Sequence, residues 1–561
     1  MRSRLICLLI LVSLGTNRGL AAPQATGMVV SQNHIASDVA AETLRRGGNA
    51  VDAAVACAFA LAVVHPAAGN LGGGGFIVVS LPGQEPTTFD FRETAPAAAT
   101  AEMFLDEAGR YDASRHHESY LAVGTPGTVA GLWLAHGRLG RRPWRELLAP
   151  AIRLAKEGFP VTKQLASEFD RLRPSFEKHP SSLRVFSRPD GSPWRVGDRF
   201  IQADLAATLE RIRDDGLRGF YEGKTAELIC AQMQRGGGLI TRDDLRSYRA
   251  VERAPVIGSY RNHKIVSMAP PSSGGVTLIN MLNMLETFPV VRDPARRVHL
   301  VSETMRRGFA DRARLLGDPD FNPPGQGLDL LEKEHGRRAA ADIDLARASQ
   351  SRIEGLSWMQ PEGDQTTHLS VVDPDLGAVS MTYTLENSYG SKIVVEGAGF
   401  LLNDEMGDFN PLAGMTTEEG LIGTAPNLLA PGKRMLSSMT PTIVFDAENR
   451  PRLVVGTPGG RTIINTVYNI ITSVIDLRFP IDQAVRVGRY HHQWFPDRIL
   501  LEEALDEEGL ADALRDMGHV VELRRQMGCA SCIEIRWNRK GAWSLMPGVD
   551  PRYPDAGAAT P

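Results

Sequence analysis

Two threonines come together through a predicted hairpin. Residues 367–372 and 378–384 each alternate between apolar and polar side chains, and residues 373–377 between them have the composition of a turn. If the turn centres on Asp375, Thr366 faces Thr384 across the ladder, and their side chains can touch. A hydroxyl attacks a carbonyl carbon only when a base takes its proton. The two threonines alone supply no such base. Taken alone, they are also what an ordinary half-buried strand would contain.

A second hairpin leads to a pair of glycines. Residues 442–445 and 452–455 are strand-like, and residues 462–477 have a helical pattern. The glycines at 459–460 therefore lie between a strand and the start of a helix, where backbone N–H groups can hold a developing negative charge. Extending the hairpin brings the serines at 437–438 to the same end.

Other catalytic signatures are absent from the sequence. It contains no G-x-S-x-G elbow, no H-E-x-x-H helix and neither of the common glycine-rich phosphate loops. The run of glycines at 72–75 lacks a following Lys-Ser/Thr, so we expect close backbone packing there. His491 and His492 have no ligand partner at metal spacing, so we expect structural histidines. The sequence predicts neither a metal site nor a cofactor.

Cys529 and Cys532 have C-x-x-C spacing. A zinc site would need two further ligands, and the sequence has no matching pair. The residues that follow alternate like a strand, whereas a redox motif of this type opens a helix. We expect either a structural disulfide or two small core residues.

The first 22 residues have the order of a secretory signal peptide. Arg2 and Arg4 precede an apolar stretch, residues 5–14, and small residues end at Ala21-Ala22. The apolar stretch is too short to span a bilayer, which needs about 20 residues. We expect an exported protein, periplasmic or secreted, with no membrane span in its mature form.

The composition is that of a globular protein. The chain has 561 residues, 43% of them hydrophobic and 23% charged, with a formal net charge of −4. No basic patch indicates a nucleic-acid partner. The expected elements are a strand at 28–30, a helix capped by Ser37 or Asp38 and ending at the glycines at 47–48, a helix at 50–64, strands at 76–81 and 88–91, and a mainly helical region over 126–353. A polar stretch, 357–365, reads as an exposed connection suited to cleavage.

Several ordered blocks resemble the γ-glutamyltransferases (γ-glutamyltranspeptidases, glutathione hydrolases). The blocks are residues 70–76, 90–96, 365–373, 381–385, 399–403, 406, 408–409, 436–442 and 456–460, and the resemblance spans about 28–552. It implies an α+β fold, the four-layer αββα sandwich of the N-terminal-nucleophile hydrolases, formed jointly by two subunits from one precursor.

The same resemblance implies self-cleavage between Gln365 and Thr366. The products would be a large subunit, 23–365, and a small subunit, 366–561, which stay together as a heterodimer. Thr366 becomes the nucleophile, and its new α-amino group is a fitting base because it titrates at about 7.7–8.0, against about 10.4 for lysine. Thr384 would orient the hydroxyl.

Further roles follow from the matching positions. The resemblance implies an oxyanion hole at Gly459 and Gly460, α-carboxylate contacts from Arg92, Ser437 and Ser438, and α-ammonium contacts from Glu386, Glu405 and Asp408. These residues together would hold a zwitterionic γ-glutamyl group, because a guanidinium suits a carboxylate and acids suit an ammonium.

The chain departs from the common pattern in four places. Glu386 and Glu405 stand where many bacterial relatives carry Asn and Gln, and Asp404 stands where asparagine is usual. Glu419 takes the place of an aromatic gate in the loop 410–434 that resembles a lid. We therefore expect an unusually anionic pocket and a different closing contact, which leaves the balance of hydrolysis and transpeptidation open.

The predicted function is cleavage of γ-glutamyl amides such as glutathione through a γ-glutamyl-threonine ester, with transfer to water or to an acceptor amino acid or peptide. One alternative is a related self-cleaving acylase acting on glutaryl or cephalosporin-type amides, which would not need the three acids together. Another is an exported non-catalytic binding protein on the same fold, which would be expected to lose Thr366 or the glycine pair.

Overall fold

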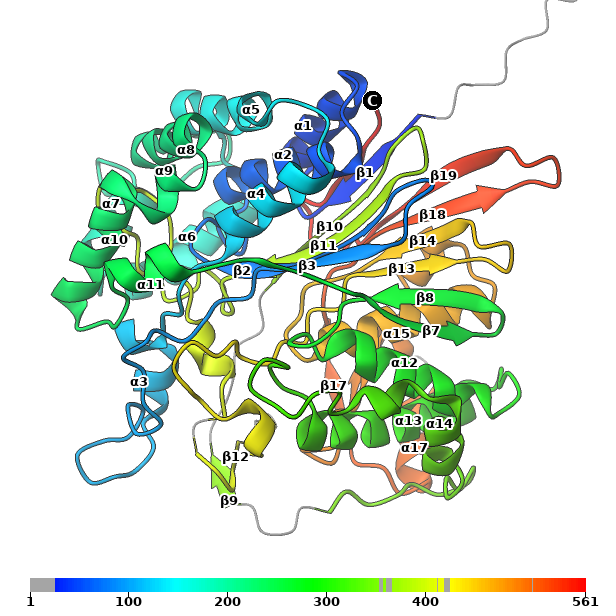
Figure 1. Ribbon diagram of the computed structural model, residues 1–561. Helices are drawn as coiled ribbons and strands as arrows, with labels where there is room; N and C mark the ends of the chain where they lie inside the picture. The colour runs from blue at the N-terminus through cyan, green and yellow to red at the C-terminus, as the bar shows by residue number, and fades with distance from the viewer. Residues whose placement is uncertain (1–25, 353–356, 360–365, 411, 418–423, 507) are drawn as a thin grey trace, which may run out of the picture.

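Two β-sheets face each other, and helices cover the outer face of each sheet (Figure 1). The computed structural model describes residues 26–352, 357–359, 366–410, 412–417, 424–506 and 508–561. The order helix, sheet, sheet, helix is the predicted αββα sandwich, which is confirmed.

The first sheet has seven strands in the order β20-β1-β10-β11-β2-β3-β6, and every neighbouring pair is antiparallel. Its strands are β1 (Met28–Ser31), β2 (Gly74–Ser80), β3 (Thr87–Asp90), β6 (Val251–Arg253), β10 (Thr367–Val372), β11 (Ala378–Thr384) and β20 (Gly557–Ala559). The central strands β10 and β11 follow Thr366 in the chain, and their neighbours β1 and β2 precede it.

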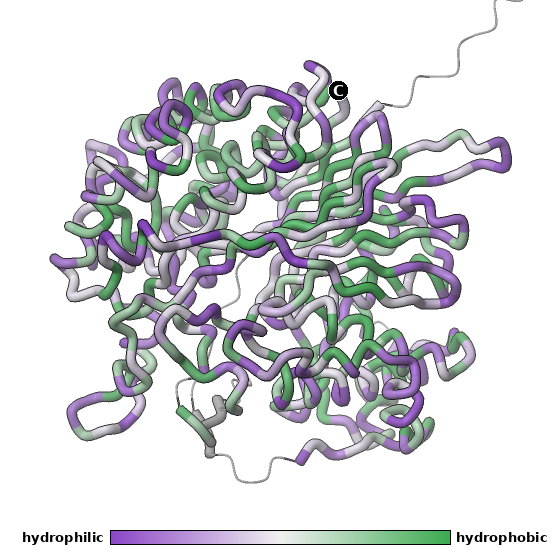
Figure 2. Tube along the Cα trace, in the orientation of Figure 1, coloured by the Kyte–Doolittle hydropathy of each residue, from purple (hydrophilic) through white to green (hydrophobic). Residues whose placement is uncertain are grey.

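The second sheet has six strands in the order β19-β18-β14-β13-β8-β7. They are β7 (Val256–Tyr260), β8 (His263–Ser267), β13 (Thr442–Phe445), β14 (Pro451–Val455), β18 (Ser531–Trp537) and β19 (Trp543–Val549). Apolar side chains from both sheets meet in the middle layer, among them Phe76, Val78, Val266, Ile443, Val454 and Ile533. In Figure 2 many residues along the strands of both sheets have hydrophobic colouring.

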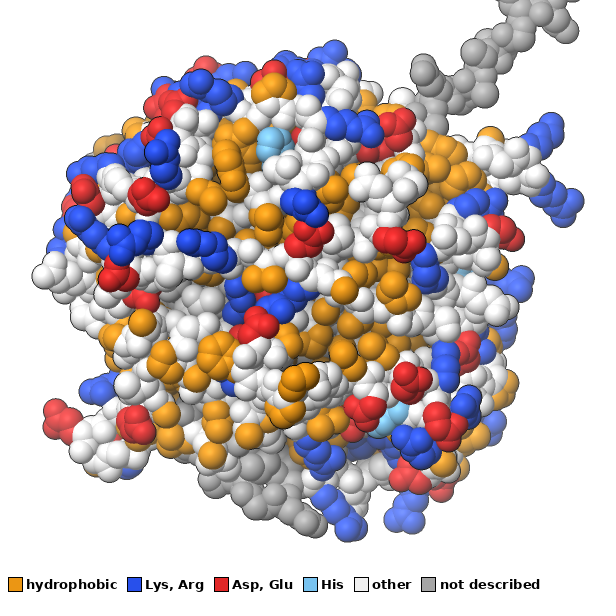
Figure 3. All heavy atoms as spheres, in the orientation of Figure 1, with side chains coloured by type: hydrophobic (Ala, Val, Ile, Leu, Met, Phe, Trp, Pro, Cys, Tyr) orange, Lys and Arg blue, Asp and Glu red, His pale blue; other side chains and the backbone are white. Residues whose placement is uncertain are grey.

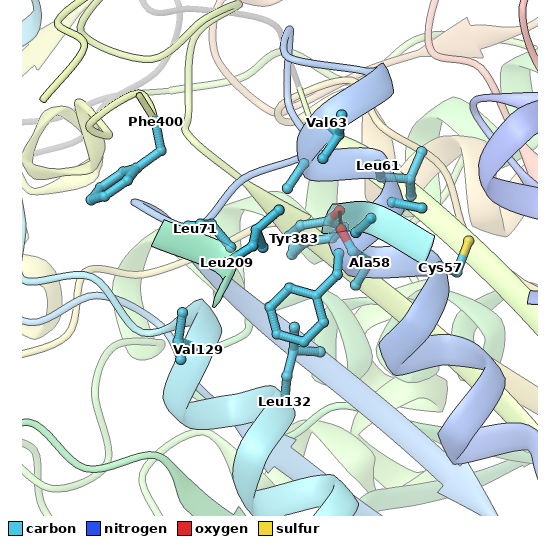
Figure 4. Packing of buried hydrophobic residues seen from close by; sticks show 14 of the residues in the cluster. Cys57, Ala58, Leu61, Val63, Leu71, Val129, Leu132, Leu209, Tyr383 and Phe400 are labelled. Carbon is cyan, nitrogen blue, oxygen red and sulfur yellow. Dashed lines mark hydrogen bonds between the residues drawn. The ribbon is translucent and has the colours of Figure 1, made fainter. Parts of the chain in front are cut away.

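The helices on the first sheet include α1 (His34–Arg45), α2 (Ala50–Val64), α4 (Thr128–Leu139), α5 (Trp144–Glu157) and α8 (Ala203–Asp215). Every residue of α2 is buried, and most are small, so the helix can lie close to the sheet and to its neighbours. Tyr383 of β11 reaches into this layer, where its hydroxyl donates to Ala58 O over 3.0 Å (Figure 4).

The helices on the second sheet include α12 (Gly274–Glu286), α13 (Pro294–Leu315), α15 (Thr462–Ile475) and α17 (Leu510–Asp516). Their apolar faces share one core with the outer face of that sheet. The remaining helices are α3 (Ala113–His117), α6 (Lys163–Phe176), α7 (Pro180–Phe186), α9 (Arg218–Tyr221), α10 (Gly223–Gly236), α11 (Arg242–Ser247), α14 (Lys333–Ala340) and α16 (Ile481–Ala484).

Short strands complete the chain: β4 (Phe159–Pro160), β5 (Arg199–Phe200), β9 (Ser357–Met359), β12 (Met415–Thr417), β15 (Tyr490–His491), β16 (Ile499–Glu502) and β17 (Val521–Arg524). A 3₁₀ turn, η3 (Glu405–Asp408), carries two of the predicted site acids. On the face drawn in Figure 3, acidic and basic side chains are intermixed, which agrees with the small net charge.

Both predicted hairpins are present. β10 and β11 pair with the expected register, and β13 pairs with β14 around a bulge at Val444/Phe445. The helix predicted at 50–64 has those bounds. The first helix differs: it begins at His34 because Asn33 caps it, accepting from Ile35 N.

Two other expectations differ from the structure. Strands β6, β7 and β8 interrupt the region predicted as mainly helical. Within the polar connection, residues 357–359 form β9, which pairs with β12 in parallel. The proposed signal peptide, Gln365 and Glu419 lie outside the described residues. No helix in the described part of the chain is long and apolar enough to cross a membrane.

Candidate active site

Thr366 lies one residue before β10 and is buried, with 6% of its surface exposed. In the ladder with β11, Thr367 faces Tyr383. Thr366 and Thr384 are therefore the next opposed positions, just beyond the last pair of the ladder at the start of β10 and the end of β11. The turn chemistry at 373–377 fixes this register because Asp373 accepts hydrogen bonds from the N–H groups of Asp375 and Gly377.

Thr384 is held by its neighbours on both sides. Its hydroxyl oxygen accepts from Glu386 N over 2.8 Å. Its backbone oxygen accepts from Asn70 Nδ2 over 2.8 Å, while Asn70 Oδ1 accepts from Gly73 N over 2.9 Å. A Cβ on Gly73 would lie 2.0 Å from Thr384 O, so only glycine allows this approach. The glycine run therefore serves close backbone packing, as predicted, and Asn70 is a positioning residue that the sequence analysis missed.

The glycine pair opens α15. Gly459 and Gly460 have φ angles of +131° and +53°, a region that favours glycine. The carbonyl of Gly459 accepts from Thr462 N over 3.0 Å and from Thr462 Oγ1 over 2.7 Å, which turns the chain into the helix. Among the described residues, neither glycine N–H donates to a backbone carbonyl. Gly459 and Thr366 line the same cavity.

Arg92 is fully buried and binds two of the predicted acids directly. Its Nη1 donates to Glu405, and its Nη2 donates to Asp408. Its Nε also donates to Met435 O over 3.2 Å, next to the Leu436-Ser437-Ser438 segment. The structure thus brings together groups that the resemblance assigns to opposite ends of one substrate.

The backbone of Arg92 is fixed as well. Tyr248 Oη donates to Arg92 O over 2.8 Å, and Arg434 Nη1 donates to the same oxygen over 2.6 Å. Burial alone would lower the pKa of Arg92, but the carboxylates of Glu405 and Asp408 outweigh it and raise that pKa. The guanidinium therefore stays charged in the site.

Glu93, which follows Arg92, was missed by the sequence analysis. It is fully buried, its Oε2 lies 3.8 Å from Arg92 Nη1, and neither carboxyl oxygen has a hydrogen-bond partner among the described residues. Burial raises the pKa of Glu93 to about 8, and it also raises the pKa of Glu405 well above its ordinary value. Among these acids Glu93 has no hydrogen bond to Arg92, so it is the one that we expect to hold a proton at neutral pH, while Glu405 stays ionised in its ion pair.

The other predicted recognition residues lie around this cluster. Glu386 has a φ of +77°, and its Oε1 is 3.8 Å from His117 Nδ1. A Cβ on Gly407 would lie 2.8 Å from Glu386 Oε2, which places Glu386 against η3. The hydroxyl oxygen of Ser437 accepts from Met439 N over 3.2 Å.

Ser438 contacts a different arginine, Arg312. Its hydroxyl oxygen accepts from Arg312 Nη2 over 3.0 Å, and Arg312 Nε donates to Ser273 Oγ over 2.8 Å. Nothing distinguishes Arg312 in the sequence from the other arginines of its helix, so it could not be found there.

Asn403 joins the glycine run to η3. Its Nδ2 donates to Gly72 O over 2.7 Å, and its Oδ1 accepts from Glu405 N over 3.1 Å. Next to it, Asp404 accepts from Asn387 Nδ2 over 2.7 Å, and burial raises the pKa of Asp404 to about 6. Asp404 is therefore a buried acid that can be protonated near neutral pH.

The remaining candidate groups make contacts within the described part of the chain. Cys529 and Cys532 are buried free thiols. Of the two alternatives, a disulfide or two small core residues, the structure has the second. His491 hydrogen-bonds Asn465 and Gln493. His299, Glu303 and His519 have ligand-type atoms within 4.8 Å of one another. However, the two histidines share a 2.8 Å hydrogen bond, and Glu303 pairs with Arg306 and Arg307.

Comparison with known proteins identifies the family of this chain. The family model described as gamma-glutamyltranspeptidase matches residues 36–560. The glutathione hydrolase proenzyme of Escherichia coli (strain K12) is 42% identical over 515 residues, covering 91% of this chain and 88% of the relative.

Two solved structures are also similar to this chain. The structure of Helicobacter pylori gamma-glutamyltranspeptidase is 43% identical with a TM-score of 0.54, covering 55% of this chain and 89% of that one. A cephalosporin acylase from Bacillus halodurans is 24% identical with a TM-score of 0.83, covering 96% of both chains, and this likeness concerns the fold alone. The extent of the family match and the identity to the relatives show that this chain belongs to the gamma-glutamyltranspeptidase family.

Proposed function

We propose that this enzyme cleaves γ-glutamyl amides such as glutathione, with Thr366 as nucleophile, and passes the γ-glutamyl group to water or to an acceptor amine. The observation that carries the proposal is the placement of Thr366, which lies opposite Thr384 at the open end of the ladder and shares a cavity wall with Gly459. The family membership supports the same chemistry.

The proposed reaction has two acyl transfers. The hydroxyl of Thr366 attacks the γ-carbonyl carbon, its proton passes to the α-amino group of the same residue, and the C–N bond breaks as that proton moves to the leaving amine. The N–H groups of Gly459 and Gly460 stabilise the negative oxygen. Water or an acceptor amine then attacks the ester and gives a proton to the α-amino group, and the C–O bond breaks as that proton passes to the Thr366 oxygen.

The free α-amino group requires maturation. We propose cleavage between Gln365 and Thr366, which gives chains 23–365 and 366–561 that remain together as a heterodimer. The description of the Escherichia coli relative as a proenzyme supports a processed enzyme. We also propose that residues 1–22 direct export to the periplasm or the medium and are removed.

Recognition of the donor uses charges that already face each other. Arg92, Ser437 and Ser438 would hold the α-carboxylate, and Glu386, Glu405 and Asp408 would hold the α-ammonium. A zwitterionic ligand could enter between Arg92 and η3, exchanging the internal ion pairs for two of its own. Because burying a single charge is costly, a donor without the ammonium should not open this cluster.

The experiment compares matched anilides. The purified protein is incubated with glutathione and with the γ-glutamyl, N-acetyl-γ-glutamyl and glutaryl derivatives of one aniline, with Thr366→Ala as the control. We expect the last two anilides to be roughly a hundredfold worse in kcat/KM, since charge-assisted hydrogen bonds contribute roughly 1.5–3 kcal/mol each. A glutaryl anilide cleaved as well as the γ-glutamyl one would instead identify an acylase.

A further inference from the structure

Two adjacent histidines at the end of α3 pack against the proposed donor site. His116 and His117 are the last residues of this helix, and both are buried. Asp112 caps the start of α3 through hydrogen bonds to two backbone N–H groups. At the other end, His116 Nε2 lies 2.9 Å from Met406 O. The histidine pair is therefore held against η3, the 3₁₀ turn that carries two of the proposed ammonium-binding acids.

The hydrogen-bond partners of the pair determine which ring nitrogens carry a proton. A carbonyl oxygen only accepts, so His116 Nε2 carries the proton that it donates to Met406 O. Burial lowers the pKa of His116 well below its ordinary value, so the ring is neutral and its Nδ1 is an acceptor. Tyr111 Oη lies 2.8 Å from that Nδ1 and donates to it. The oxygen of Tyr111 then faces His117 Nε2 at 3.4 Å as an acceptor, which favours a proton on that nitrogen.

The other ring nitrogen, His117 Nδ1, is therefore a buried acceptor. Burial lowers the pKa of His117 to about 4, although the carboxylates of Asp408 and Glu118 act in the opposite direction. The ring is thus neutral at pH 7. Nδ1 has no hydrogen-bond partner among the described residues. Because a buried acceptor without a donor is costly, a ligand N–H that reaches this atom is favoured.

This acceptor faces the ammonium end of the proposed donor site. His117 Nδ1 lies 3.8 Å from Glu386 Oε1. One ammonium nitrogen can donate to two acceptors at that separation, since a charge-assisted hydrogen bond is about 2.7–2.9 Å long. Gly407 allows the arrangement, because a Cβ there would lie 2.5 Å from His117 Nδ1 and 2.8 Å from Glu386 Oε2. A larger residue at position 407 would push the imidazole and the carboxylate away from η3.

We propose that His117 is a further specificity-determining residue, whose Nδ1 accepts a hydrogen bond from the α-ammonium of the donor beside Glu386. The proposal rests on the proposed γ-glutamyl cleavage and concerns how its donor is selected. An ammonium has three N–H groups, and a neutral acceptor takes one of them without adding another negative charge beside the three acids. Tyr111 and His116 support this role by keeping the proton of His117 on the opposite nitrogen.

The test compares donors with and without the ammonium in two variants of His117. The donors are the γ-glutamyl and glutaryl derivatives of 4-nitroaniline, and the measured quantity is the ratio of their kcat/KM values. His117→Leu keeps an apolar side chain of some size but no acceptor, so this ratio should fall about tenfold or more, the range of a charge-assisted hydrogen bond. His117→Asn offers an amide oxygen at the place of Nδ1, so its ratio should stay within about threefold of wild type.

The ratio separates recognition from a structural role. A histidine that only supports the fold would slow the cleavage of both anilides alike. An unchanged ratio in His117→Leu, or an equal fall in His117→Asn, overturns the proposal. His34→Leu is the matched control, because His34 is exposed at the start of α1, and it should leave the ratio unchanged.

A measurement on the wild-type enzyme does not depend on the folding of any variant. With isotope-labelled histidine, NMR should show His117 Nδ1 as an unprotonated ring nitrogen whose resonance shifts when glutamate is added and not when glutarate is added. A protonated Nδ1, or an equal response to both compounds, contradicts the proposal. Wild-type protein that does not cleave the γ-glutamyl anilide would refute the proposed function itself, whereas cleavage with an unchanged ratio in His117→Leu refutes only the role of His117.

Discussion

Arg92 and Glu405 lie 313 residues apart in the chain and form an ion pair that is almost completely closed to solvent. Asp408, on the same 3₁₀ turn, binds the other arm of the guanidinium. Arg92 comes from the loop after β3, before Thr366, and the two acids come from a segment after it. The proposed donor site therefore contains residues from both parts of the chain, and Arg92 is already paired with acids before a substrate enters.

The first prediction concerns this pair. Arg92→Ala should lower the free energy of unfolding by about 3–5 kcal/mol, because it leaves Glu405 buried without its cation. Arg92→Lys should keep the positive charge but lose the second hydrogen-bonding arm of the guanidinium. It should therefore reduce kcat/KM for the γ-glutamyl anilide less than Arg92→Ala does. Urea unfolding and anilide kinetics measure the two effects.

The double variant Arg92→Ala/Glu405→Gln separates stability from recognition. It removes both charges, so it should recover much of the stability lost in Arg92→Ala while activity stays low. Recovery of activity together with stability would show that Arg92 does not bind the donor.

The second prediction concerns maturation. Wild-type protein should consist of two chains, one ending at Gln365 and the other beginning with Thr366, whereas Thr366→Ala should remain one chain because the attacking hydroxyl is gone. Intact-mass measurement and N-terminal sequencing distinguish these forms. A uniformly uncut but active wild-type enzyme would contradict the mechanism.

The third prediction concerns Thr384. Thr384→Ala removes the oxygen that accepts from Glu386 N, so Glu386 and the nucleophile should both be less well placed. Misplacement of reacting groups can cost on the order of 10²-fold, and we expect this loss in both turnover and self-cleavage. Thr384→Ser keeps the hydroxyl and is the matched control. Activity of Thr384→Ala within about twofold of wild type would show that the two threonines do not act together.

The fourth prediction is a pH dependence of stability from Glu93. Burial raises the pKa of this carboxyl to about 8, while an unfolded glutamate titrates near 4.3. Between these values the folded protein holds a proton that the unfolded chain has lost, so stability falls as pH rises through this window.

Glu93→Gln places a neutral amide at this position. Its stability should therefore depend less on pH between about 5 and 8, and the variant should gain on wild type at the alkaline end. Urea midpoints across this range provide the measurement. Parallel curves for the two proteins would show that Glu93 is ionised throughout.

The local parts of the fold could be predicted from the sequence, because they depend on neighbouring residues. The pairing of Thr367 with Tyr383 in the β10–β11 hairpin follows from the alternation of apolar and polar side chains and from the position of the turn. The buried helix α2 follows from its run of small residues. Strands β7 and β8 were missed because they are short and lie within a largely helical region. In the first helix the cap is Asn33, since Ser37 instead donates to Gly557 O, a partner 520 residues away.

For the candidate site, the sequence indicated individual residues but not the contacts between them. The resemblance supplied the residues and roles, but it did not show that Arg92 and the acids of η3 contact one another before a donor arrives. Glu93 and Asn70 both lie inside the recognised blocks, yet their roles depend on burial and on a carbonyl 314 residues away. Such long-range contacts have no signal in a single sequence.

The first sheet alternates strands from before and after Thr366, and this order bears on when the proposed cleavage could occur. In the first sheet, β10 and β11 are each hydrogen-bonded to a strand that precedes Thr366. While the backbone is continuous, it tethers the two parts at an effective concentration that is commonly millimolar for short linkers. Two separately synthesised chains would lack that tether and would display unpaired strand edges, which are prone to aggregation. The proposed cleavage before Thr366 is therefore expected only after the sheets have formed, with the continuous chain keeping the two parts together while they fold.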